Sequence, residues 1–427
     1  MKDPIRKGAW IASTKKHLDR LQYSPEVSEF AATEIAGKAA NLLALMQADE
    51  RDRVSPEALN AYCVSAKIRP AERPTVLKKL QDDQRIEVLK KGEKIEAIDV
   101  YTFSKEEVLK SAARIFDASD PTPRDVANIE GLEHVCLLPR AESELVDHLT
   151  KAGFKDRDAV LTVKLQQELG LAGVDRSPAL AEPIIFNEHA FVKEPSKIVA
   201  ALKALKPQER QTLLDVQHYV ETTGCTVLDE LAKKFPPDVL RLMEGLGLLD
   251  RQEVVSPFGN ASFATLPQTF GVYGGKLGIG VDCFHHAKML LCCLTFGTVK
   301  SIWRRGKINN PVDILNSLLR GNEVGPCTAI GQDYVTLEKE GVVSLRRARH
   351  KVGEQYYMRL RKREVGELAK QVFLYKRTYS DTGILALPNP SPTHDYVNPQ
   401  DKRAQILAVP VGPVEEVRAK LLTALRT

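Results

Sequence analysis

Three times along this sequence, a run of helical segments is followed by two short extended runs around a turn. In the first case, "AANLLALMQA", "SPEALNAYCVSAK" and "RPTVLKKLQDDQRI" have helical periodicity, with Val76, Leu77 and Leu80 on one face of the third segment. "IEVLKKGEKIEAIDVYTF" then carries two extended runs around "KKGEK". Ser55 followed by Pro56 is typical of a helix start. The order predicts small helical modules that each end in a β-hairpin.

The same order recurs in the second half of the chain. "PQERQTLLDVQHYVETTG", "TVLDELAKKF" and "PPDVLRLMEGLGLL" predict three helices, and "DRQEVVSPFGNASFATL" predicts a hairpin that turns at residues 257–260. Further on, "VDCFHHAKMLLCCLTF", "NPVDILNSLLRG" and "TAIGQDYVTLEKEG" precede the hairpin "VVSLRRARHKVGEQYYMRL". Because side chains alternate along a strand, Tyr357, Arg359 and Arg361 should share one face of its second strand.

Three helices followed by a hairpin is the element order of the winged helix-turn-helix superfamily, and the three stretches resemble that superfamily in this order. The resemblance implies a third helix that can enter a DNA major groove and a hairpin, the wing, that can lie along phosphates. Proteins of this kind are typically DNA-binding regulators, and some bind other proteins. We therefore expect a mainly α protein with small β-hairpins, an α+β fold of tandem winged-helix-like domains joined by a helical connector.

The 427 residues are enough for two to four compact units. Three helical patterns fill the space between the first two stretches: one begins with a capping box at Ser104 and Glu107, and the next two end near glycines. We expect an N-terminal helical segment at 1–37, winged-helix-like domain 1 at 38–103, a helical connector at 104–195, winged-helix-like domain 2 at 196–267, a Gly-rich joint at 268–281, a basic winged-helix-like domain 3 at 282–378, and a Pro-rich linker with a C-terminal strand and helix at 379–427.

Positive charge gathers on the third stretch. Residues 341–380 hold eleven Lys and Arg against three Glu, whereas the whole chain has a net charge of only +5. Arginine forks suit phosphate oxygens, and a tyrosine can stack or donate a hydrogen bond. The predicted nucleic-acid contacts are Arg304, Arg305, Lys307, Arg346, Arg347, Arg349, Lys351, Tyr357, Arg359 and Arg361 in the third stretch, and Lys78 and Lys79 in the first.

Acidic residues limit what the helices can do in this prediction. Glu338 and Glu340 lie late on the third helix of the third stretch and would repel DNA, so its wing should contribute more than its helix. Five acids interrupt the basic residues of the first stretch. The third helix of the second stretch is nearly uncharged, which favours a packing or dimer surface. The bland alternative for the arginines is a solvated sheet edge.

Several kinds of site find no support in the sequence. The seven cysteines include no CxxC pair, which indicates reduced core residues of a cytoplasmic protein. The glycines at 274, 275, 278 and 280 fit neither GxxxxGK[ST] nor GxGxxG, so a joint is favoured over a phosphate cradle. The longest apolar stretch, "MLLCCLTF", is too short to span a bilayer, and the N-terminus does not resemble a signal peptide. We expect no metal, no cofactor and no membrane contact.

The main hypothesis is a non-enzymatic, cytoplasmic protein that binds double-stranded DNA mostly through its backbone, as a transcription regulator or as the DNA-binding subunit of a DNA-processing or defence assembly. The alternative is a scaffold that binds proteins, or a homodimer, through the second winged-helix-like unit and the C-terminal helix. A third hypothesis is an enzyme with a site around Glu188, His189, His285 and His286, although a neighbouring acid and base without a nucleophile define no reaction.

Overall fold

The computed structural model describes residues 1, 3–19, 21, 25–48, 53–102, 104–178, 180–191, 195–273, 281–349 and 354–379. The chain divides into two compact units. Met1–His134 and Glu142–Val174 belong to the first, and Val135–Ala141 and Asp175–Gly383 to the second. The predicted glycines at 274–280 and the predicted C-terminal linker, strand and helix beyond residue 379 lie outside the described residues.

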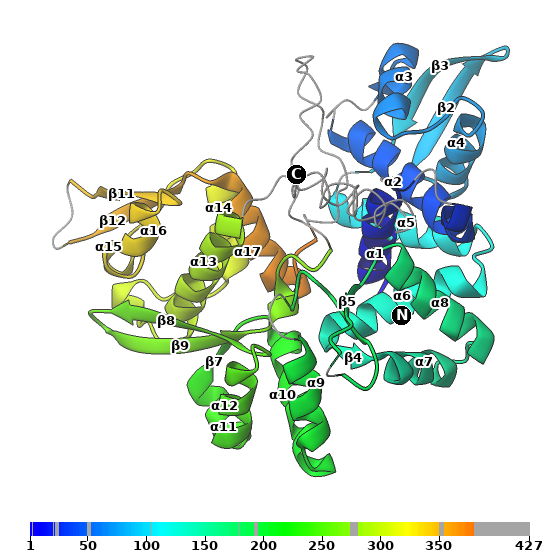
Figure 1. Ribbon diagram of the computed structural model, residues 1–427. Coiled ribbons are helices and arrows are strands. Elements are labelled where there is room, and N and C mark those ends of the chain that lie inside the picture. Colours follow the sequence, from blue (N-terminus) through cyan, green and yellow to red (C-terminus); the bar gives the residue numbers. More distant parts are fainter. Residues whose placement is uncertain are drawn as a thin grey trace, which may run out of the picture. The chain divides into compact units, whose positions relative to one another are not determined.

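One order of elements occurs four times within the described residues: helix, strand, helix, helix, strand, strand (Figure 1). We call the copies modules A (31–100), B (123–186), C (207–265) and D (311–360). Module A consists of α2 (Ala31–Ala48), β1 (Arg53–Val54), α3 (Pro56–Ser65), α4 (Arg73–Asp82), β2 (Ile86–Lys91) and β3 (Lys94–Val100). Module B consists of α6 (Pro123–Leu137), β4 (Arg140–Ala141), α7 (Glu142–Lys151), α8 (Asp156–Glu168), β5 (Gly173–Asp175) and β6 (Ile184–Phe186).

The other two copies belong to the second unit. Module C consists of α10 (Pro207–Thr223), β7 (Thr226–Val227), α11 (Leu228–Lys234), α12 (Pro237–Gly245), β8 (Asp250–Ser256) and β9 (Gly259–Thr265). Module D consists of α14 (Pro311–Leu319), β10 (Val324–Cys327), α15 (Thr328–Asp333), α16 (Val335–Lys339), β11 (Val343–Arg347) and β12 (Tyr356–Leu360). In each module the helices begin after short loops, several with proline at the first helical position.

Each module closes with a three-stranded sheet in the same strand order. The last strand is central, with the hairpin partner on one side and the first, short strand on the other: β1-β3-β2, β4-β6-β5, β7-β9-β8 and β10-β12-β11. Both neighbours of the central strand run antiparallel to it in modules A, C and D. The expected fold class is therefore confirmed at the level of a mainly helical protein with small antiparallel sheets.

The remaining helices frame these modules. The first unit begins with α1 (Pro4–Leu18) and η1 (Pro25–Phe30), and α5 (Lys105–Asp117) packs against α1 and α2. The α5 helix starts as expected, because the Ser104 side chain accepts a hydrogen bond from the Glu107 N–H. The second unit adds α9 (Pro195–Ala204), η2 (Pro267–Thr269), α13 (Val281–Val299), η3 (Trp303–Arg305) and α17 (Arg363–Tyr375).

The structure differs from the expectation in three places. Residues 104–195 were expected to form a helical connector, but they also carry the strands of module B; these strands have only two or three residues, too few to leave an alternating pattern. The expected boundary at 37/38 falls inside α2. The apolar helix α13 was expected to open the third stretch, yet module D begins only at α14, and α13 packs against α17 instead.

One hydrophobic core runs through modules C and D. It extends from Phe263 of module C, through Leu290 and Leu294 of α13, to Met358 and Leu315 of module D. Among the described residues, no helix has both the length and the apolar character needed to cross a membrane.

The tip of the β8–β9 hairpin is fixed to α15 of module D and to η3, which precedes that module. The Ser256 hydroxyl donates a hydrogen bond to Asp333 Oδ1 at 2.6 Å, and the Phe258 ring lies 4.7 Å from the Arg305 guanidinium carbon. The wing-like hairpin of module C is thus used for packing within the second unit.

Candidate nucleic-acid interface

The β11–β12 hairpin of module D, which we call wing D, has one buried and one exposed face. Arg346 lies opposite Tyr357 in the register, and Ser344 lies opposite Arg359. Met358, between them, is only 1% exposed and belongs to the core. Alternation therefore directs Arg346, Tyr357 and Arg359 to the other face, where both arginines are exposed. The shared face predicted for Tyr357 and Arg359 agrees with this register.

Arg346 is held in place by two neighbours on this face. Its Nε and Nη2 donate to the two carboxylate oxygens of Glu323, at 3.3 and 2.5 Å, and its guanidinium lies 4.6 Å from the centre of the Tyr357 ring. The hydrogen bonds from Arg346 hold the pKa of Glu323 below its usual value. The pair is exposed, so it contributes little to stability and a phosphate can compete with Glu323 for Arg346.

Other arginines of the hairpin carry less compensated charge. Arg347 lies 3.8 Å from Glu354, and both side chains are mostly exposed. Arg349, Arg359 and Arg361 are exposed and form no ion pair with any residue that the structure describes. The predicted contact Lys351 lies outside the described residues. Wing D therefore presents Arg349 and Arg361 without a described acidic partner, whereas Arg359 lies near enough to Glu323 to help lower the pKa of that carboxyl group.

The segment "KSIWRRGK" divides into exposed and buried charges. Arg304 and Lys307 are exposed, without an ion pair to the part of the chain that the structure describes. Arg305 is only 7% exposed; it pairs with the buried carboxylate of Asp333, and its Nε donates to Gln332 Oε1 at 3.0 Å. Arg305 was predicted to contact nucleic acid. The structure instead buries its guanidinium against Asp333, because a buried carboxylate requires a charged partner.

The third helix of module D is poorly suited to a DNA groove. α16 has only five residues. Glu338 and Glu340 are exposed at its end, and Glu338 accepts a hydrogen bond from the Leu345 N–H of β11 at 2.8 Å. Both acids are exposed at the end of α16, the late position on the helix that the sequence predicted, and Glu338 contacts the hairpin strand β11.

Module A combines an exposed helix face with a basic hairpin. On α4, Thr75, Lys78 and Gln81 are exposed. Lys79, also predicted as a contact, is half-buried and donates to the carbonyl of Ala118, so it is turned toward the following helix. Of the two predicted lysines, only Lys78 lies on the open face.

The sequence prediction left the hairpin lysines of module A out of the contact set. Lys90, Lys91 and Lys94 surround the β2–β3 turn, are all exposed, and have no ion pair among the described residues. Gly92 occupies the turn with a φ of +65°, a conformation that glycine adopts without strain. Five acidic residues are near these lysines in the sequence, and for that reason the sequence prediction did not count the lysines as contacts.

Two of those acids are engaged elsewhere in the fold. Glu72 pairs with Lys38 of α2 at 2.9 Å. Asp83 accepts from the Arg114 guanidinium of α5, with one N–O distance of 3.0 Å. Hydrogen bonds from Arg69 and Lys38 outweigh the effect of burial and lower the pKa of Glu72 to about 2, so this carboxylate stays ionised and bound to its partners. These two acids therefore do not pair with Lys78 or with the hairpin lysines of module A.

Module C offers no comparable surface. Leu240 and Met243 of α12 are buried in a core that also includes Leu213 and Val216 of α10. The packing role expected for this helix agrees with their burial. Because Leu240 and Met243 are buried, they are not available to the apolar dimer surface that was the alternative expectation. The module's hairpin tip is already docked on module D.

The residues considered for an enzyme site do not assemble into one. His285 is exposed and His286 is buried; Nε2 of His286 lies 3.4 Å from Glu340 and its Nδ1 lies 3.4 Å from the Lys362 ammonium. Glu188 is exposed in a different part of the second unit. Within the described ranges, no group of three or more His, Cys, Asp or Glu side chains could hold a metal ion.

Comparison with known proteins adds no relative: no protein-family model, no curated protein and no solved structure matches this chain. A function is therefore inferred only from the surfaces described above.

Proposed function

We propose that this chain is a non-enzymatic, cytoplasmic protein that binds double-stranded DNA through winged-helix modules. The support at the level of fold is the fourfold order of helix, strand, helix, helix, strand, strand, with the last strand central in every sheet. This is the order of a winged helix, in which the hairpin is the wing. The chain would act as a transcription regulator or as the DNA-binding subunit of a DNA-processing or defence assembly.

The observation that carries the proposal is the exposed face of wing D. Arg346, Tyr357 and Arg359 lie on one face of a two-stranded hairpin whose other face is anchored in the core. Arg361 follows directly after β12, and its N–H donates to the Val342 carbonyl, which fixes its backbone. A hairpin with one face anchored in the core and several guanidinium groups suits the phosphates of a duplex, because these contacts need position and charge but no base sequence.

Module A adds the only elements among the described residues that we assign to base contact. α4 is twice as long as α16 and exposes Thr75, Lys78 and Gln81. Glutamine can form paired hydrogen bonds with adenine, and lysine can donate to guanine. Any sequence preference should therefore depend on α4, while wing D contributes to affinity on every sequence.

The test is the salt dependence of binding to a random-sequence DNA duplex. Wild type should show a steep fall of log affinity with log salt, and replacing Arg359 and Arg361 by Ala should reduce the slope by roughly 0.9 for each lost phosphate contact. The matched control replaces two exposed basic residues of module C, Lys233 and Arg241, and should leave the slope unchanged. Absence of binding by the wild type at low salt would overturn the proposal.

Protein binding is a second candidate, favoured by one exposed apolar pair. Trp303 is 69% exposed and the preceding Ile302 is 50% exposed, although large apolar side chains are usually covered. Self-association through this pair would give a concentration-dependent mass in light scattering that Trp303→Ala abolishes. A constant monomer mass would remove the homodimer from consideration.

A further inference from the structure

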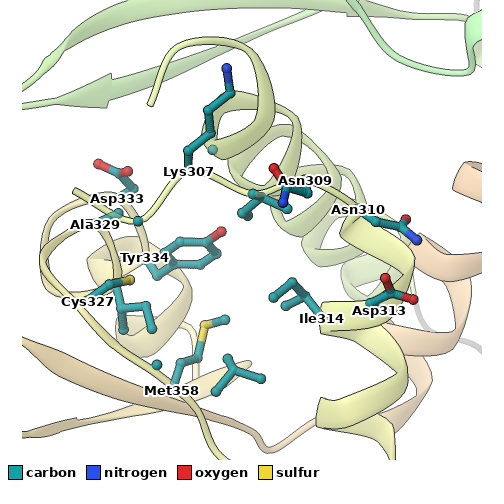
Figure 2. Close-up of a pocket in the computed structure, with 16 residues that line it drawn as sticks. Lys307, Asn309, Asn310, Asp313, Ile314, Cys327, Ala329, Asp333, Tyr334 and Met358 are labelled. Atoms are coloured by element: carbon teal, nitrogen blue, oxygen red, sulfur yellow. The ribbon is translucent and has the colours of Figure 1, made fainter. Parts of the chain in front are cut away.

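Module D contains a cavity that the proposed DNA contact does not use. It has a volume of about 360 Å³ and lies between α14, β10, β12, the start of α15 and the loop that precedes α14 (Figure 2). Its walls are mostly apolar, formed by Ile308, Ile314, Val324, Ile330 and Met358. A volume of this size is at the lower end of small-molecule sites and is much larger than the space of one water molecule.

A buried phenol reaches into this cavity. Tyr334 is 3% exposed, and Figure 2 shows its ring directed into the cavity, with the hydroxyl toward the side on which Asn309 lies. Its hydroxyl has no hydrogen-bond partner among the residues that the structure describes. Burial raises the pKa of this phenol well above its ordinary value, so it keeps its proton and can only donate or weakly accept. An acceptor on a ligand in the cavity would give the Tyr334 hydroxyl a hydrogen bond that no described residue supplies.

The charges around the cavity do not favour an ionised ligand. Figure 2 shows the Lys307 side chain directed away from the cavity centre. The Asp333 carboxylate, which also lines the cavity, is neutralised by Arg305. Asp313 is exposed at the start of α14, in contact with solvent. The cavity therefore combines mostly apolar walls with neutral polar groups, among them the Tyr334 hydroxyl and the side-chain amides of Asn309 and Asn310.

We propose that module D binds a small, neutral aromatic molecule that carries a carbonyl-type oxygen. The aromatic ring fills the space between Ile314, Ile330 and Met358, and the oxygen accepts a hydrogen bond from the Tyr334 hydroxyl. This site is distinct from the DNA-contact surface of wing D and does not depend on DNA binding. Tyr334 separates α15 from α16, so the ligand contacts the segment that holds Glu338 against β11.

The test compares two probes of the same shape on the full-length protein without DNA. Acetophenone and isopropylbenzene each have nine heavy atoms, and a carbonyl oxygen in the first replaces a methyl group in the second. Both should bind the wild type in ligand-observed NMR titrations, with acetophenone about tenfold tighter because of one hydrogen bond. Magnetisation transfer from the Met358 methyl and the Tyr334 ring should locate the bound probe.

Two variants separate the cavity from the hydroxyl. Tyr334→Phe keeps the ring, so both probes should still bind and the preference for acetophenone should disappear. Ile314→Phe fills the cavity and should abolish binding of both probes; circular dichroism checks its fold, and Val324→Phe replaces it if it does not fold. The proposal is overturned if the wild type binds neither probe, binds both equally, or if a folded cavity-filling variant binds them as the wild type does. None of these outcomes bears on DNA binding.

Discussion

Single residues in this fold are placed by partners that lie far away in the sequence. Asp125 of α6 is fully buried and accepts hydrogen bonds from the backbone N–H groups of Ala32 and Thr33, both at 3.1 Å, so it caps the start of α2. The Thr33 hydroxyl donates to its other oxygen at 2.5 Å. Burial outweighs these hydrogen bonds and raises the pKa of Asp125 to about 6.

The pKa of Asp125 predicts a pH dependence of stability. An acid whose folded pKa lies above its unfolded value binds more protons in the folded state, so the free energy of unfolding should fall as pH rises from about 4 to about 6. Urea titrations across this range would measure the slope for the wild type and for Asp125→Asn. The variant should lose most of the Asp125 contribution, and identical slopes would contradict the assignment.

The buried pair of Arg305 and Asp333 should be important for stability and irrelevant to DNA contact. Asp333→Ala leaves a buried guanidinium without its counter-charge and should cost about 3–5 kcal/mol in unfolding free energy. The control is Asp238→Ala, which removes an exposed partner of Arg241 and should cost less than about 1 kcal/mol. Chemical denaturation measures the unfolding free energy of both variants. Equal losses would mean that the pair of Arg305 and Asp333 is no more important for stability than an exposed ion pair.

At the level of elements, close approach between α15 and β12 depends on one glycine. A Cβ atom at Gly331 would lie 2.2 Å from the Tyr356 ring, so Gly331→Ala should force the helix and strand apart and cost about 1–3 kcal/mol. Gly245 of α12 is the matched control, because a Cβ there meets nothing within 4 Å. In thermal unfolding, the midpoint temperature of Gly331→Ala should be lower than that of the wild type, and the midpoint of Gly245→Ala should not. Similar midpoints for the two variants would show that α15 can move away from β12 without cost.

Elements with a clear periodicity were predictable from the sequence, whereas very short ones were not. Alternation over five residues of β12 is enough to place Tyr357 and Arg359 opposite the face of Met358. β4, with two residues, has no such pattern, so module B was missed. Its helices α7 and α8 were expected as connector helices, and only the order of elements with the short strands β4, β5 and β6 reveals the fourth copy.

The residues of the candidate site were predictable only where a side chain is exposed to solvent and has no partner that is distant in the sequence. The exposed positions of Arg346, Arg359 and Arg361 follow from local pattern. Arg305 looks the same in sequence as Arg304, because its partner Asp333 comes from another element. The cavity beside Tyr334 could not be predicted from the sequence. Its walls come from several separate segments, and each wall residue taken alone looks like an ordinary core residue.

For the whole second unit, the shared core predicts that modules C and D lose structure together. Phe263 of module C is fully buried in that core, and Phe263→Ala should cost about 3–5 kcal/mol. Hydrogen exchange should then show faster exchange in β12 of module D as well as in β9. Exchange that accelerates in module C alone would mean that the two modules unfold independently.

The docked hairpin of module C has a consequence for dividing the chain into fragments. A cut between module C and α13 would leave Ser256 without its acceptor and Phe258 without the Arg305 that covers it, and it would separate Phe263 from α13. Each fragment would expose apolar side chains that are buried in the shared core, so either fragment expressed alone should aggregate. Although modules C and D have the same element order, neither can be expressed or exchanged on its own. A gene for the second unit must therefore encode both modules in one chain.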